Sequence, residues 1–90
     1  MAFARSGLAR VSGANSDAGS LWMYSSTDAM TVIRAADYFL DAINEINVND
    51  VIIVASATGG TPVLQFTYCN ANDGTTIDVV DGLVIPSTDT

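Results

Sequence analysis

Carboxylates are the side chains of this sequence that could perform acid–base chemistry, because its 90 residues include no histidine and no lysine. Asp37 and Asp41 are one helical turn apart, and Asp78 and Asp81 flank an expected turn. Two carboxylates that face one cleft can hydrolyse a glycoside. Helix capping by Asp37, solvation of Asp41 and turn formation by the other two explain both pairs more simply. We therefore expect no catalytic residues, and a small acid-pair hydrolase is the least favoured of three hypotheses.

Oxygen-bearing side chains also gather at residues 70–78. Asn70, Asn72, Asp73, Thr75 and Asp78 offer the hard ligands that Ca²⁺ prefers. Their spacing is not that of an EF-hand loop, which has a glutamate at its twelfth position. A polar hairpin tip is the favoured interpretation, because Asp-Gly at residues 73–74 supplies the positive φ of hairpin turns.

Cys69 is the only cysteine, which excludes an internal disulfide. With no histidine beside it, the chain has too few of the ligands that a zinc site needs. It falls in an alternating segment beside aromatic residues, where a small buried apolar role fits better than that of a nucleophile. The Thr-Gly-Gly-Thr turn at residues 58–61 is too short for a phosphate-binding loop and lacks its lysine. We expect no cofactor and no metal.

Strands dominate the elements that would position these groups. Alternating or continuous apolar runs predict strands at residues 20–25, 30–34, 51–57, 63–69, 75–80 and 83–85. A helix is expected at about residues 37–46, with Asp37 as its N-cap and an apolar stripe from Tyr38 to Ile46. The expected fold is mainly β: a small antiparallel β-sandwich or barrel-like domain over residues 20–90, with one short α-helix and an extended N-terminal arm.

Residues 1–19 are predicted to be that arm, because small and polar residues interrupt them. The arm is expected to dock on a neighbour through three apolar anchors and two of the chain's three basic residues: Phe3, Leu8, Val11, Arg5 and Arg10. The alternative is that the two arginines only keep a loose end soluble.

Composition predicts a folded domain that interacts with protein. The chain is 49% hydrophobic and carries a net charge of −7, which argues against nucleic acid and against an anionic membrane surface. No apolar run approaches the roughly 20 residues of a membrane span, and the first residues lack the apolar stretch of a signal peptide. A lone core of this size is marginal, so support from an oligomer or a larger body is expected.

Aromatic residues are the expected contacts of that oligomer. The segment at residues 20–25 is apolar on both faces, so a second subunit is one way to cover it. The candidate interface residues are Trp22, Tyr24 and Tyr68. A platform that binds carbohydrate through exposed Tyr24 and Tyr68 is the alternative.

Six short segments carry a family resemblance: RSGLARVSGANS at residues 5–16, SLWMYSSTD at 20–28, ADYF at 36–39, VNDVI at 48–52, ATGGTP at 57–62 and DVVDG at 78–82. In their order and spacing they resemble small proteins encoded among the virion structural genes of tailed bacteriophages. The resemblance spans residues 5–82, nearly the whole chain. Members of that family often have glycine at the positions of Asp37 and Asn49.

The resemblance implies a non-enzymatic protein associated with the phage head, as a decoration (cement) protein or the base of a head fibre. It implies binding to the major capsid protein and to copies of itself, commonly as a trimer. The implied location is the capsid exterior, after synthesis in the host bacterial cytoplasm. The alternative is a receptor- or carbohydrate-binding module of a virion fibre.

Overall fold

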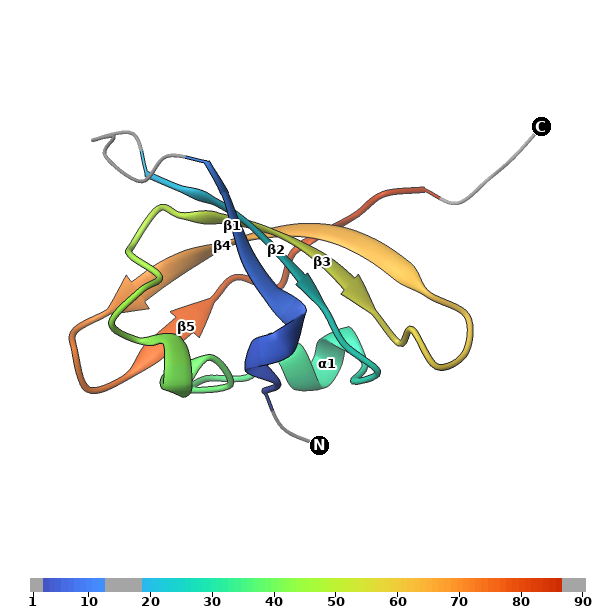
Figure 1. The fold of residues 1–90 in the computed structure, drawn as a ribbon, viewed down its shortest axis with the longest axis horizontal. Coiled ribbons are helices and arrows are strands. Elements are labelled where there is room, and N and C mark those ends of the chain that lie inside the picture. The colour runs from blue at the N-terminus through green and yellow to red at the C-terminus, as the bar shows by residue number, and fades with distance from the viewer. Residues whose placement is uncertain (1–2, 13–18, 87–90) are drawn as a thin grey trace.

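A single curved sheet forms most of the molecule in the computed structural model, which describes residues 3–12 and 19–86 (Figure 1). Over these residues the strand order is β1-β2-β3-β4-β5, and β6 also pairs with β4. The strands are β1 (Leu8–Ser12), β2 (Leu21–Ser25), β3 (Val51–Ser56), β4 (Val63–Asn72), β5 (Ile77–Val79) and β6 (Leu83–Val84). The expected mainly β fold is therefore confirmed.

One strand pair departs from the expected antiparallel arrangement. Strands β2 and β3 run parallel, whereas the other neighbours are antiparallel. Parallel neighbours need a long crossover, and residues 26–50 provide it. Figure 1 shows this crossover on one side of the sheet, with α1 (Met30–Ile33) and the 3₁₀ helix η2 (Leu40–Ala42) beneath the strands.

The helix predicted at residues 37–46 is wrong, and so is the strand predicted at residues 30–34. Asp37 has a φ of 65°, so it does not have the extended backbone of an N-cap. Its N–H donates to the Ile77 carbonyl and its Oδ1 accepts from the Ile77 N–H, which ties this turn to β5. The apolar stripe after Asp37 is still buried, but only the short helix η2 forms within it.

The segment predicted to be a docking arm contributes to the sheet instead. Strand β1 pairs with β2, and the 3₁₀ helix η1 (Arg5–Gly7) precedes it. Gly7 is required there, because a Cβ would collide with the Ser25 carbonyl. Residues 8–12 are therefore an integral strand of the sheet, and residues 1–2 and 13–18 lie outside the described residues.

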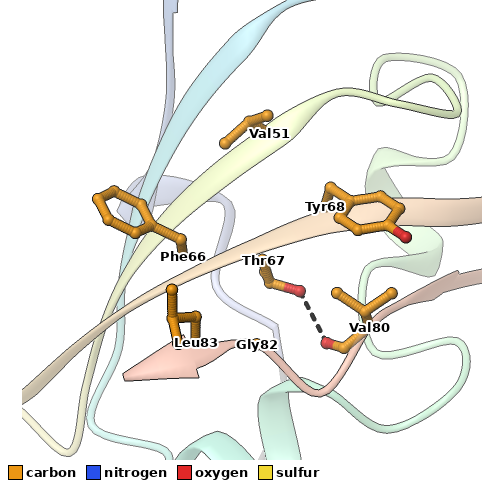
Figure 2. A pocket seen from close by; sticks show the side chains of 7 residues that line it. All are labelled: Val51, Phe66, Thr67, Tyr68, Val80, Gly82 and Leu83. Atoms are coloured by element: carbon orange, nitrogen blue, oxygen red, sulfur yellow. Dashed lines mark hydrogen bonds between the residues drawn. The ribbon is translucent and has the colours of Figure 1, made fainter. Parts of the chain in front are cut away.

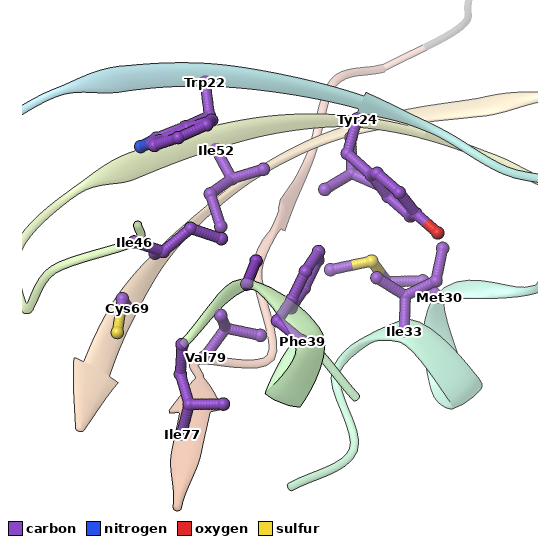
Figure 3. Close-up of a cluster of buried hydrophobic side chains, with 12 residues drawn as sticks. Trp22, Tyr24, Met30, Ile33, Phe39, Ile46, Ile52, Cys69, Ile77 and Val79 are labelled. Atoms are coloured by element: carbon purple, nitrogen blue, oxygen red, sulfur yellow. The ribbon is translucent and has the colours of Figure 1, made fainter. Parts of the chain in front are cut away.

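The core lies between the sheet and the crossover (Figure 3). Strands β2 to β4 provide Trp22, Tyr24, Ile52, Val54 and Cys69, all at most 5% exposed. The crossover covers them with Met30, Ile33, Phe39, Ala42 and Ile46. Burial of this one apolar face is the main source of stability. Within residues 3–12 and 19–86, no helix has the length and apolar character needed to span a membrane.

A buried carboxylate fixes the strand ends next to this core. Asp50 is fully buried and precedes β3. It accepts hydrogen bonds from the Ser20 N–H at 2.8 Å, the Trp22 indole at 3.0 Å and the Asn47 N–H at 2.9 Å. Trp22 lies in β2, Ser20 directly precedes it, and Asn47 lies in the crossover. Asp50 therefore holds β2 and β3 in register.

Candidate functional site

The face of the sheet opposite the core consists of three rows of side chains, which strand register aligns across β2, β3, β4 and β6. The rows are Leu21, Val51 and Tyr68; then Met23, Ile53, Phe66 and Leu83; then Ser25, Ala55 and Leu64. We call these ten residues the outer face. Alternation along each strand produces it, because successive side chains point to opposite sides of a sheet.

The outer face is apolar and open to solvent. Met23 is 47% exposed, Phe66 42%, Tyr68 45% and Leu83 68%. With Val51 and Leu64 included, the exposed apolar surface is on the order of 600 Å², and patches of that size on monomers are often functional. None of the ten residues carries a charge. This combination is typical of a protein-binding surface.

A groove crosses the outer face where β4 changes partner from β6 to β5 (Figure 2). The chain between these two short strands leaves the ladder, and Gly82 makes the bend with a φ of 93°. The resulting groove of about 480 Å³ has Phe66 and Tyr68 on its two sides and Val51 and Leu83 along its wall. The Thr67 hydroxyl at its floor already donates to the Val80 carbonyl at 2.7 Å, so the groove suits an apolar guest.

No charged side chain belongs to the outer face or lines its groove, although Asp81 lies between the groove residues Val80 and Gly82. Arg5 bridges Glu45 at 2.7 Å and also donates to the Asp41 carbonyl, on the crossover side. Arg34 follows α1 and approaches Asp81 at 3.9 Å. One ion pair, Arg5–Glu45, thus joins the N-terminal segment to the crossover, and because both side chains are about half exposed it contributes little to stability.

The five predicted docking residues have partners within the domain or lie at its edge. Phe3 stacks on Tyr24 with ring centroids 5.4 Å apart, and Leu8 packs against the core. Arg5 is held by its ion pair with Glu45, and the Arg10 guanidinium lies 4.7 Å from the centre of the Trp22 ring. Val11 is 51% exposed on edge strand β1. These contacts account for the first four residues without any docking partner.

Two of the three expected interface aromatics belong to the core. Trp22 is 5% exposed and Tyr24 1%, so neither is available to another subunit, and Tyr68 alone lies on the outer face. The Tyr24 hydroxyl is within 2.8 Å of the Tyr38 hydroxyl, which donates to Asp28 Oδ2. Burial, followed by the hydrogen bond with Tyr24, raises the pKa of the Tyr38 phenol. These are structural hydrogen bonds of the interior.

The candidate acid pairs have local partners. Asp37 accepts from the Ile77 N–H, and Asp78 accepts from the Val79 N–H. Asp81 faces Arg34, and Asp41 is exposed within η2. Neither pair lines the groove between Phe66 and Tyr68. Nothing in this placement brings two carboxylates together over a common substrate position.

The oxygen cluster at residues 70–78 forms a hairpin tip. Asp73 Oδ1 accepts backbone N–H bonds from Thr76 and Thr75, and these bonds lower the pKa of Asp73. The Asn72 amide donates to the carbonyls of Ile43 and Ile46, so it is turned toward the crossover. Within residues 3–12 and 19–86, no group of three or more acidic or cysteine side chains is placed to hold a metal ion.

Cys69 lies on the inner face of β4 and is fully buried. Burial raises the pKa of its thiol, which keeps the sulfur protonated and unreactive. The role expected for it as a small apolar residue agrees with this position.

Sequence reasoning missed Met23 and Leu83 as surface residues. Their signal was the apolar character of both faces of β2 and β3 together with the strict alternation in β4. That pattern predicts two covered faces, and the structure covers only one. No protein-family model, curated protein or solved structure compared with the chain matches it. The outer face and the sequence resemblance are therefore the basis for a proposed function.

Proposed function

We propose that this chain is a non-enzymatic structural protein of a tailed-phage virion. It decorates or cements the capsid by binding the major capsid protein and copies of itself. The observation that carries the proposal is the outer face, which is apolar, uncharged and exposed in an otherwise acidic chain. Such a surface recruits protein, whereas nucleic acid and anionic membranes require positive charge.

Backbone conformation supports the resemblance on which the phage assignment rests. Asp37 and Asn49 have φ values of 65° and 77°. At both positions the phage proteins often have glycine, the residue that adopts positive φ without strain. A shared pair of left-handed turns explains why glycine, aspartate and asparagine exchange there, because the latter two tolerate this conformation better than other residues do.

Strand β1 is the proposed contact with the capsid protein. It forms one edge of the sheet, and edge strands readily pair with another chain. Val11 is exposed on this strand, whereas Arg10 is held over the Trp22 ring and near the Glu45 carbonyl. The proposed docking element is therefore an ordered edge strand and not a free arm. The proposed location remains the capsid exterior, after synthesis in the host cytoplasm.

A receptor- or carbohydrate-binding module of a fibre is the second candidate. The groove between Phe66 and Tyr68 favours it, because sugars stack on exposed aromatic rings. The Thr67 hydroxyl in that groove is already engaged, and sugar recognition also needs polar groups that fix orientation. Protein contact is therefore the better supported of the two.

Co-sedimentation with capsid shells of the encoding phage tests the proposal. The wild-type protein is expected to sediment with the shells and to saturate at a fixed ratio to the capsid protein. Val11→Asp should weaken this binding at least tenfold, whereas Thr75→Asp, which adds the same charge at the hairpin tip, should not. If the wild-type protein stays in the supernatant at every salt concentration, it does not bind the capsid and the proposal fails.

A further inference from the structure

Charge placement restricts what can cover the outer face. All the charged residues within residues 3–12 and 19–86 lie outside it: Arg5, Arg10, Asp28, Arg34, Asp37, Asp41, Glu45, Asp50, Asp73, Asp78 and Asp81. Two molecules that each carry a net charge of −7 repel each other unless the surfaces that meet are neutral. The outer face meets this requirement, so it is suited to contact with its own counterpart on another copy.

The area of the outer face is sufficient for such a contact. Roughly 600 Å² of exposed apolar surface per copy gives about 1,200 Å² for two copies, the lower end of the range for specific, stable interfaces. Pairing would also stabilise the domain, because a domain of this size buries a smaller share of its surface than larger domains do.

The shape of the outer face is self-complementary across β3. Met23 projects from β2, and the groove between Phe66 and Tyr68 lies over β4, so the two features lie on opposite sides of β3. A two-fold axis that runs parallel to β3, midway between two stacked sheets, places β2 of one copy over β4 of the other. It also keeps the rows aligned, since Met23, Ile53 and Phe66 share one row.

We propose that the outer face binds the outer face of a second copy of this chain, with Met23 of each copy packed on the Phe66 ring of the other, at the edge of the groove between Phe66 and Tyr68. Methionine fills such irregular gaps, and its sulfur packs favourably on aromatic rings. The contact is isologous, so both copies gain the same burial. The two sheets form one aligned sandwich with the usual separation of about 10 Å.

This inference rests on the proposed function, because it specifies the surface through which the chain binds copies of itself. Sedimentation equilibrium of the whole chain is expected to give a dimer at micromolar concentration. Phe66→Asp should weaken dimerisation at least a hundredfold, because two carboxylates would be buried at one interface. Thr75→Asp, with the same change of charge, should leave the dimer intact, and circular dichroism of both variants should match that of the wild type.

Cross-linking tests the position of the axis. Residues on the exposed side of β3 face their own counterparts in this dimer, so Ile53→Cys treated with a short bismaleimide should give covalent dimers. Thr75→Cys at the hairpin tip should remain uncoupled. Cys69 is fully buried and provides no competing thiol. A dimer that Ile53→Cys does not cross-link would place the axis elsewhere and overturn the geometry.

The remaining outcomes separate this inference from the proposed function. If the wild-type protein is a monomer but still sediments with capsid shells, the second-copy assignment is overturned and the capsid role stands. If Phe66→Asp then abolishes binding to the shells, the capsid protein is what covers the outer face. A trimer, the state implied by the phage resemblance, overturns the two-fold axis. A monomer that also fails to bind shells refutes both proposals.

Discussion

Replacement of Asp50 by alanine tests the hydrogen bonds that hold β2 beside β3. The carboxylate is fully buried and accepts three N–H bonds, from Ser20, Trp22 and Asn47, at 2.8 to 3.0 Å. Asp50→Ala removes all three acceptor contacts and leaves two backbone donors and one indole donor without their partner. Asp50→Asn keeps one acceptor oxygen and turns an amide group toward the remaining donors.

The cost of each change follows from the number of donors left unpaired. A buried donor without a partner costs about 1–3 kcal/mol, and local relaxation makes three such losses less than additive. We therefore expect Asp50→Ala to lower the free energy of unfolding by about 4 kcal/mol and Asp50→Asn by about half as much. A domain of this length is stable by roughly 5–13 kcal/mol, so the alanine variant should remain measurable but weak.

Urea denaturation followed by tryptophan fluorescence measures both effects. Trp22 is the only tryptophan and donates to Asp50, so its emission reports on the same hydrogen bonds that the substitution removes. Asp41→Ala is the matched control, because that carboxylate is exposed and its removal should change stability by less than about 0.5 kcal/mol. If Asp50→Ala costs no more than Asp41→Ala, the stabilising role assigned to these bonds is refuted.

Three further substitutions examine backbone strain, the buried phenol and acid sensitivity. Ala57→Gly should raise the free energy of unfolding in urea by about 0.5 kcal/mol, because Ala57 has a φ of 54°, and a loss of stability would contradict this. Tyr38→Phe should cost about 1–2 kcal/mol in the same assay, because the Tyr38 hydroxyl donates to Oδ2 of the buried Asp28, whose Oδ1 already has no hydrogen-bond partner among the described residues. An unchanged midpoint would show that this bond is not stabilising. Backbone N–H bonds lower the pKa of Asp73, so its stabilising effect is complete above the ordinary value of 3.8 and is lost as the pH falls below it. Asp73→Asn should therefore flatten the acid side of a plot of melting temperature against pH, and a curve parallel to that of the wild type would count against this account.

Local patterns in the sequence located the strands of the sheet. Alternation at residues 63–69 predicted the first part of β4 and its two faces, and the apolar run at residues 51–57 predicted β3. The Asp-Gly turn correctly joined β4 to β5, because positive φ at Gly74 is a local requirement. Each of these features depends on neighbouring residues alone, which is why the sequence predicts them well.

Features that depend on contacts between distant residues were predicted poorly. The stripe from Tyr38 to Ile46 has helical spacing, yet Asp37 is held in a left-handed turn by Ile77, which is distant in the sequence. Strand β1 looked like an arm because its composition is small and polar, and only pairing with β2 makes it a strand. Trp22 and Tyr24 looked like interface residues because the sequence does not reveal which face of β2 the crossover would cover.

The outer face is where the prediction for the central strands was only partly correct. The sequence predicts that both faces of the central strands are covered, and the structure covers one face with residues 26–50. The described residues include no second layer, because the strands after β3 extend the same sheet. A crossover of this length covers one side of a sheet, and the proposed contact with a second copy would cover the apolar residues on the other side. On that proposal the spacing of Met23, Ile53, Phe66 and Leu83 belongs to the assembly, and the isolated domain displays one of the two sheets of a sandwich.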